Sequence, residues 1–207
     1  MSRVVSWCLF AAVLQFGCGP SETAEDARVE ASVPDPVRAE LIDMGVQDQT
    51  AREGLTPEKV QDSLFLKAML QGDSGRTRRL RELVGRYGWP TEVQVGPEAA
   101  HAAFLILQHS PEHNFQREML PALEEQAQQG AMPPSQVAML VDRVLVHDGK
   151  PQRYGTQFSV EEGRLVLEPV EDEEGLDARR REMQLPPMEE YIRLLEEQYK
   201  APVSEQQ

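Results

Sequence analysis

The segment from Ala99 to Leu107 constrains the fold most, because it is apolar on nearly every side of the helix that it predicts. Pro97 marks the start of this helix, since proline is favoured in the first turn, and the helix ends near His109. A helix that is apolar all round has to be covered on all its faces. We therefore expect it to lie at the centre of a core made by other helices.

Amphipathic segments on both sides of it predict the helices that would cover it. Apolar residues recur at helical spacing in residues 37–52, 57–71, 78–87, 115–129, 137–147, 176–183 and 188–199. Between residues 154 and 170 the pattern changes, and the segments 154–160 and 164–170 predict a β-hairpin in which Gly163 takes the left-handed turn position. The expected fold class is mainly α, with a single helical domain over residues 37–207 and one small β-hairpin near 154–170.

The first 17 residues have the layout of a secretory signal peptide. Arg3 supplies a positive charge, and an apolar run from Val4 to Phe16 follows. A membrane-spanning helix needs about 20 apolar residues, so this run is too short to span a bilayer. We expect residues 1–17 to be removed on export.

Cys18 is the predicted lipidation site. The segment from Leu14 to Cys18 resembles the bacterial lipoprotein signal, although Gln15 stands where an aliphatic residue is usual. Cys8 lies in the leader, so Cys18 would be the last cysteine left, and acylation would account for an unpaired thiol in an oxidising compartment. An ordinary secreted protein with a free cysteine is the alternative interpretation.

Residues 18–36 predict a disordered tether, because they are rich in Ser, Glu, Asp, Ala and Pro and contain no aromatic residue. The expected location is the cell envelope of a bacterium, with the protein anchored by its lipid and facing the periplasm. By resemblance to lipoprotein sorting signals, Gly19 after the cysteine favours the outer membrane over the inner one.

Charge and missing motifs exclude several function classes. The net charge of −14 repels phosphate backbones and anionic headgroups, so neither nucleic acid nor a membrane surface is an expected electrostatic partner. The membrane would be reached only through the lipid on Cys18. The sequence has no G-x-S-x-G, Walker, G-x-G-x-x-G or C-x-x-C motif, and no cofactor is expected.

Asp142 and Arg143 lie within an otherwise apolar helical segment, where an unpaired buried charge would be costly. Neighbouring residues of a helix do not face each other, so each needs a partner from elsewhere. The candidates are His109 and the polar run 152–157. Either a structural network that fixes the hairpin against the helices or a ligand pocket would explain them.

The run from His109 to His113 matches H-x-x-E-H, the inverted zinc-protease pattern. Pro111 lies between the two histidines and breaks the helical spacing that would bring them onto one face. No third ligand stands out in the sequence. We therefore predict no metal site.

Several blocks together suggest a family. They are Asp48-Gln49 with Arg52, residues 88–91 (GWPT), Val95-Gly96, residues 103–109, Phe115-Gln116, residues 142–144 (DRV) and residues 151–157 (PQRYGTQ). Through them the chain resembles a bacterial family known only as a domain of unknown function, over roughly residues 41–199. The resemblance implies no activity, but it implies that Gln108-His109, Asp142-Arg143 and residues 152–157 belong to one recurring set.

The leading functional hypothesis is a cell-envelope lipoprotein of unknown activity whose domain binds a small molecule or a protein partner through a buried polar cluster. The predicted ligand-binding residues are Gln108, His109, Asp142, Arg143, Gln152, Tyr154, Thr156 and Gln157. One alternative is a hydrolase-like enzyme in which His109 is the acid or base, Asp142 orients it and Arg143 holds an anionic group of the substrate. The other is a structural or interaction module without a pocket.

Overall fold

The computed structural model describes residues 33–204. The predicted signal peptide, Cys18 and most of the predicted tether lie outside these residues. Within them, no helix combines the length and the apolar content that a membrane span requires.

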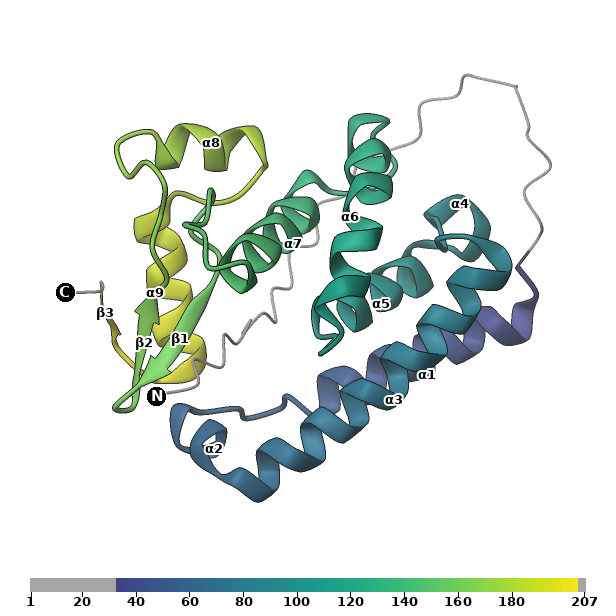
Figure 1. The fold of residues 1–207 in the computed structure, drawn as a ribbon, viewed down its shortest axis with the longest axis horizontal. Coiled ribbons are helices and arrows are strands. Elements are labelled where there is room, and N and C mark those ends of the chain that lie inside the picture. Colours follow the sequence, from purple (N-terminus) through teal and green to yellow (C-terminus); the bar gives the residue numbers. More distant parts are fainter. Residues whose placement is uncertain (1–32, 205–207) are drawn as a thin grey trace.

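The described chain is mainly α-helical, as predicted, with a small sheet near its C-terminal end (Figure 1). Its elements are α1 (Asp35–Thr50), α2 (Pro57–Gln61), α3 (Ser63–Tyr87), α4 (Glu92–Val95), α5 (Pro97–Gln108), α6 (His113–Gln128), α7 (Pro134–His147), β1 (Phe158–Glu161), β2 (Arg164–Leu167), α8 (Leu176–Glu182), α9 (Met188–Tyr199) and β3 (Val203–Ser204).

Helix α5 lies at the centre of the larger apolar cluster and contacts α1, α3, α4, α6 and α7. Its residues Ala99, Ala103 and Leu107 are completely buried, which confirms the position predicted from its apolar composition. The small alanine side chains allow α1 to approach closely. A Cβ atom built on Gly45 of α1 would lie only 2.6 Å from the Cβ atom of Ala102.

A second apolar cluster joins the C-terminal elements to the segment after α1. Its buried members are Leu55, Val60, Phe158, Leu165, Tyr191, Leu195, Tyr199 and Ala201. In Figure 1 the hairpin of β1 and β2 lies beside α9 at this end of the molecule. The two cores therefore draw on residues from both halves of the chain.

The predicted hairpin is confirmed, and its turn residues Glu162 and Gly163 have positive φ angles of 49° and 79°. Positive φ at both central residues is the requirement of a type I′ turn, which suits the twist of a two-residue hairpin. The sequence did not predict β3, a two-residue strand that pairs in parallel with β2.

The structure corrects the helix boundaries between residues 57 and 87. The break falls at Asp62, whose carboxylate accepts hydrogen bonds from the backbone N–H groups of Leu64 and Phe65 and so caps α3. The two predicted helices at 57–71 and 78–87 were wrong as separate elements, because α3 runs unbroken from Ser63 to Tyr87. The polar residues between them continue the helix and point partly into the protein.

Candidate functional site

Asp142 lies at the centre of the first polar cluster, where it holds the loop that precedes the hairpin. Its carboxylate is fully buried and accepts hydrogen bonds from the backbone N–H groups of Arg153 (2.7 Å), Tyr154 (3.1 Å) and Thr156 (3.0 Å), and from the Thr156 hydroxyl (2.9 Å). Burial raises the pKa of Asp142, and these hydrogen bonds oppose that rise. The polar run is thus the partner of Asp142.

Gln152 and Gln157 close the same loop from within. The side-chain amide of Gln152 donates to the backbone carbonyls of Gln157 (3.0 Å) and Glu168 (2.8 Å), and its oxygen accepts from the Gln157 N–H (2.8 Å). The Gln157 amide donates to the Met139 carbonyl of α7 (3.3 Å). Both glutamines are fully buried, and their hydrogen bonds tie the hairpin to α7.

His109 does not form the predicted pair with Asp142. It ends α5, where that helix crosses α1, and its Nδ1 lies 2.8 Å from Oδ2 of Asp48. The hydrogen bonds given above direct the Asp142 carboxylate toward the loop beyond α7. The two residues therefore serve different junctions of the fold, and Asp48 takes the orienting position that the sequence analysis assigned to Asp142.

Asp48 and His109 belong to a buried charged network, which we define as Asp48, Arg52, Asp73, Arg76 and His109. Arg52 bridges Asp48 and Asp73 with two contacts of 2.9 Å. Arg76 lies 2.6 Å from Asp73 and 3.6 Å from Asp48. No side chain in the network is more than 13% exposed. Its two arginines and two aspartates balance in charge.

The surroundings fix the protonation of Asp48 and His109. Burial by itself would raise the pKa of Asp48, but the hydrogen bond from His109 and the positive charges of Arg52 and Arg76 outweigh it and lower that pKa. Burial, assisted by Arg52, lowers the pKa of His109, although Asp48 opposes this. A carboxylate can only accept, so the neutral imidazole carries its proton on Nδ1 and donates it to Asp48.

The second ring nitrogen of His109 is therefore a hydrogen-bond acceptor. Among the described residues this buried Nε2 atom has no hydrogen-bond partner. The backbone of His109 (φ −93°, ψ 3°) lies in the sparsely populated bridge region. Gln116 holds the turn in place, because its amide donates to the carbonyls of Leu107, Gln108 and Ser110 at 3.0–3.2 Å.

Arg143 is a further buried group, and it has unused donors. It is 9% exposed, and its Nε and Nη2 atoms are buried without a hydrogen-bond partner in residues 33–204. Burial lowers the pKa of Arg143 to about 9. The carboxylate of the preceding residue, Asp142, is engaged with the loop.

The two histidines of the zinc-like pattern diverge. The ring of His113 stacks on that of His147 with centroids 3.4 Å apart, and its Nδ1 contacts Gln116, whereas His109 faces Asp48. Over the described part of the chain, no group of three or more His, Cys, Asp or Glu residues is arranged to hold a metal ion.

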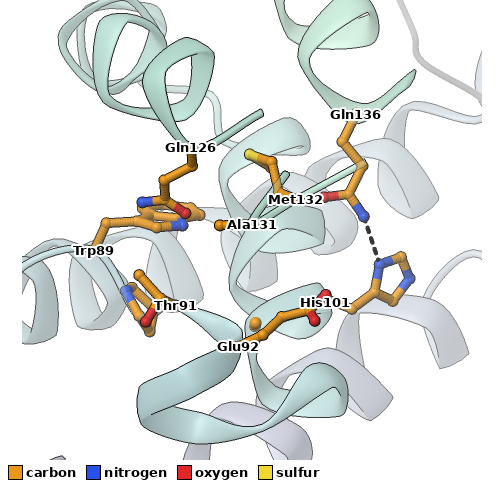
Figure 2. Close-up of a pocket in the computed structure, with 10 residues that line it drawn as sticks. Trp89, Thr91, Glu92, His101, Gln126, Ala131, Met132 and Gln136 are labelled. Atoms are coloured by element: carbon orange, nitrogen blue, oxygen red, sulfur yellow. Dashed lines mark hydrogen bonds between the residues drawn. The ribbon is translucent and has the colours of Figure 1, made fainter. Parts of the chain in front are cut away.

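The GWPT block lines a small open pocket between α4, α5, the end of α6 and the start of α7 (Figure 2). Trp89 and Thr91 form one side and face Gln126, and on the opposite side Gln136 contacts His101 at 3.1 Å. No role was predicted for these residues from the sequence.

Four members of the charged network, Asp48, Arg52, Asp73 and Arg76, were not predicted as site residues from the sequence. Asp48 and Arg52 stand in the first of the resembling blocks, but only His109 was considered a site residue. Opposite charges four residues apart (Asp48 and Arg52) and three residues apart (Asp73 and Arg76) were the available signal, since such pairs lie on one face of a helix. What the spacing did not reveal is that both pairs face the same junction.

A comparison with protein families gives a match over most of the chain. The model of a family of unknown function (DUF6624) matches residues 34–204. No curated protein and no solved structure matches the chain.

Proposed function

This chain belongs to the family of unknown function DUF6624, and because that description assigns no activity, we propose from its geometry that it is a lipid-anchored envelope protein whose helical domain binds a small anionic ligand through Arg143. The observation that carries the proposal is the buried guanidinium of Arg143 without a counter-charge. The anchor is proposed from the leader and Cys18.

Arg143 does not fit a purely structural role. A buried charge that is neither paired nor hydrogen-bonded opposes folding, and an apolar side chain of similar size would serve the core better. Groups that reduce stability in this way are commonly retained for function. An anionic ligand would supply the missing counter-charge and the missing acceptors.

The geometry of a guanidinium specifies the ligand further. Its planar fork matches the two oxygens of a carboxylate or of a phosphate group, each of which can accept two parallel hydrogen bonds. The protein as a whole carries a net charge of −14, so long-range attraction of anions is weak. We therefore expect short-range hydrogen bonds to provide most of the affinity.

The other predicted ligand-binding residues divide into two groups. Asp142, Gln152, Thr156 and Gln157 use their polar atoms to hold the loop, and we propose that they shape the site without contacting the ligand. Gln108 and the half-buried Tyr154 remain proposed contacts, whereas His109 lies at the junction with Asp48 and is not assigned to this ligand.

A second candidate is a structural or interaction module. The loop around Asp142 favours it, because a cluster whose hydrogen-bonding groups are satisfied internally has little left for a ligand. The two candidates differ in whether anions should raise the Tm of the protein through Arg143.

The test measures Tm with and without inorganic phosphate, acetate or succinate at constant ionic strength. We expect these anions, or one class of them, to raise the Tm of the wild type but not that of Arg143→Met. Without anions, Arg143→Met should be at least as stable as the wild type, because it removes a buried charge. Arg193→Met, which replaces an exposed arginine on α9, is the matched control and should keep the anion effect. An unchanged wild-type Tm with every anion would favour the structural module.

The anchor is tested separately by cell fractionation. The wild type should sediment with membranes, and Cys18→Ala should be released into the soluble envelope fraction. Membrane association that persists in Cys18→Ala would contradict lipidation at this residue.

A further inference from the structure

The junction of α1, α3 and α5 contains an oriented histidine that the anion-binding proposal does not use. Asp48 fixes Nδ1 of His109 at 2.8 Å, and Arg52 and Arg76 in turn fix Asp48. The side chains of His109 and Asp48 are 3% and 1% exposed. Three helices thus converge to hold one imidazole in one orientation.

Stability alone does not explain this histidine. The charges of Arg52, Arg76, Asp48 and Asp73 already balance, so His109 contributes no charge to the network. Its Nε2 remains a buried acceptor without a partner within the described chain, and leaving such a group unsatisfied opposes folding. A side chain that only joined α5 to α1 would not need this second nitrogen.

We infer that His109 is a general base, with Asp48 as its positioning residue. A carboxylate on Nδ1 selects the tautomer in which Nε2 carries the lone pair, and it stabilises the imidazolium that forms when Nε2 accepts a proton. Arg52 and Arg76 keep Asp48 ionised and in place. This activity goes beyond ligand binding and does not depend on Arg143.

The proposed step is the hydrolysis of an ester. Nε2 of His109 takes a proton from a water molecule as the water oxygen forms a bond to the acyl carbon. The bond from that carbon to the leaving oxygen then breaks, and the imidazolium returns the proton from Nε2 to that oxygen. The products are a carboxylic acid and an alcohol, and His109 is neutral again.

The electrostatics favour an uncharged ester over a phosphate ester. Because the charges of the network cancel, no positive charge is left to neutralise a phosphoryl group. The Nε2 atom is shielded from bulk solvent, so a substrate reaches it only after local opening of the surrounding helices.

The first test is ¹⁵N NMR of the histidines in the full chain. We expect Nδ1 of His109 to be protonated and Nε2 to be unprotonated at pH 7.5. In Asp48→Asn the preference for this tautomer should be lost, which an exclusively packing role of Asp48 would not produce. A wild-type His109 protonated on Nε2 would overturn the inference, and this measurement does not require any variant to fold.

The second test is the hydrolysis of p-nitrophenyl acetate. After subtraction of the buffer rate, the rate of hydrolysis by His109→Gln should be about 10²–10⁴-fold lower than that of the wild type. His101→Gln, which changes a histidine of the Trp89 pocket outside the network, should keep the wild-type rate. Equal rates for the wild type and a folded His109→Gln would overturn the inference. Failure of the anion-binding proposal would appear instead as an unchanged Tm, so the two outcomes are distinguishable.

Discussion

At the scale of single residues, the buried polar side chains divide by whether their hydrogen-bonding capacity is used. Asp142 accepts from three backbone N–H groups and one hydroxyl, and Gln116 donates to three carbonyls at the end of α5. His109 and Arg143, in contrast, each retain buried polar atoms without a partner among residues 33–204. The first group maintains the fold, and the second provides the candidates for function.

Asp142→Ala should destabilise the protein by about 3 kcal/mol or more, because it leaves several buried donors without an acceptor. Urea unfolding measures the change. Asp43→Asn, which alters an exposed carboxylate that contacts only Gln47 in the described chain, should change the free energy of unfolding by less than about 0.5 kcal/mol. A loss from Asp142→Ala as small as that of the control would show that the loop does not depend on this carboxylate.

His113 should make stability depend on pH. Burial, and next the neighbouring His147, lower its pKa in the folded state; Arg117 also lowers it, and Gln116 opposes the shift. The unfolded chain therefore binds a proton more readily, starting near pH 6.5. Above that pH, His113 is unprotonated in both the folded and the unfolded state. As the pH falls from about 6.5 toward the lowered pKa of the folded state, the protein loses stability.

The measurement compares the wild type with His113→Phe, which does not titrate, in urea unfolding between pH 5 and pH 7.5. As the pH decreases from 7, the wild type should lose stability relative to the variant. Parallel curves for the two proteins would show that His113 takes up a proton equally well in the folded and unfolded states.

At the scale of elements, the approach of α1 to α5 determines how the first core packs. Gly45 and Ala102 face each other where the helices cross, and there is no room for a further methyl group between them. The same approach brings Asp48, one turn further along α1, within reach of His109 at the end of α5. Close packing and the charged network therefore depend on the same contact.

Gly45→Ala should destabilise the protein by about 1–3 kcal/mol, because the new methyl group forces the helices apart. Gly85→Ala in α3 is the matched control, since a Cβ at that position meets no atom within 4 Å. It should stabilise the protein by roughly 0.5–1 kcal/mol through helix propensity. Thermal unfolding of the two variants measures the contrast, and destabilisation by both would contradict a steric cause.

At the scale of the whole molecule, two apolar clusters are joined by polar connections. The Asp142 carboxylate links α7, which borders the first cluster, to the loop that leads into β1 of the second. Arg180 of α8 is fully buried and donates to the backbone carbonyls of Tyr154 and Pro186. These links lead us to expect that both clusters unfold in one transition.

Leu195→Ala tests this coupling, because Leu195 belongs to the second cluster while Trp89 packs against the first. In a Trp7→Phe background Trp89 is the one remaining tryptophan. Leu195→Ala should lower the free energy of unfolding measured by Trp89 fluorescence by about 2–5 kcal/mol. Circular dichroism should report the same decrease. Leu194→Ala, which changes an exposed neighbour, should have little effect. Separate transitions by the two probes would contradict a single unit.

The sequence determined most of the helices and the hairpin, because their causes are local. Apolar periodicity gave the helical segments, and Gly163 gave the hairpin turn. The completely apolar stretch of α5 predicted its central position. Local signals failed at residues 72–77, where polar residues suggested an interruption. Asp73 and Arg76 are buried there in ion pairs with each other and with Arg52 and Asp48 at the end of α1.

Only the tertiary structure decided which charges meet. Asp142 and His109 both needed partners, but composition and spacing could not distinguish the loop after α7 from the end of α1. The crossing of α1 and α5 at Gly45 and Ala102 brings Asp48 to His109, although 61 positions separate them in the chain. Burial and charge pairing depend on distances through space, and these exist only once the helices have packed.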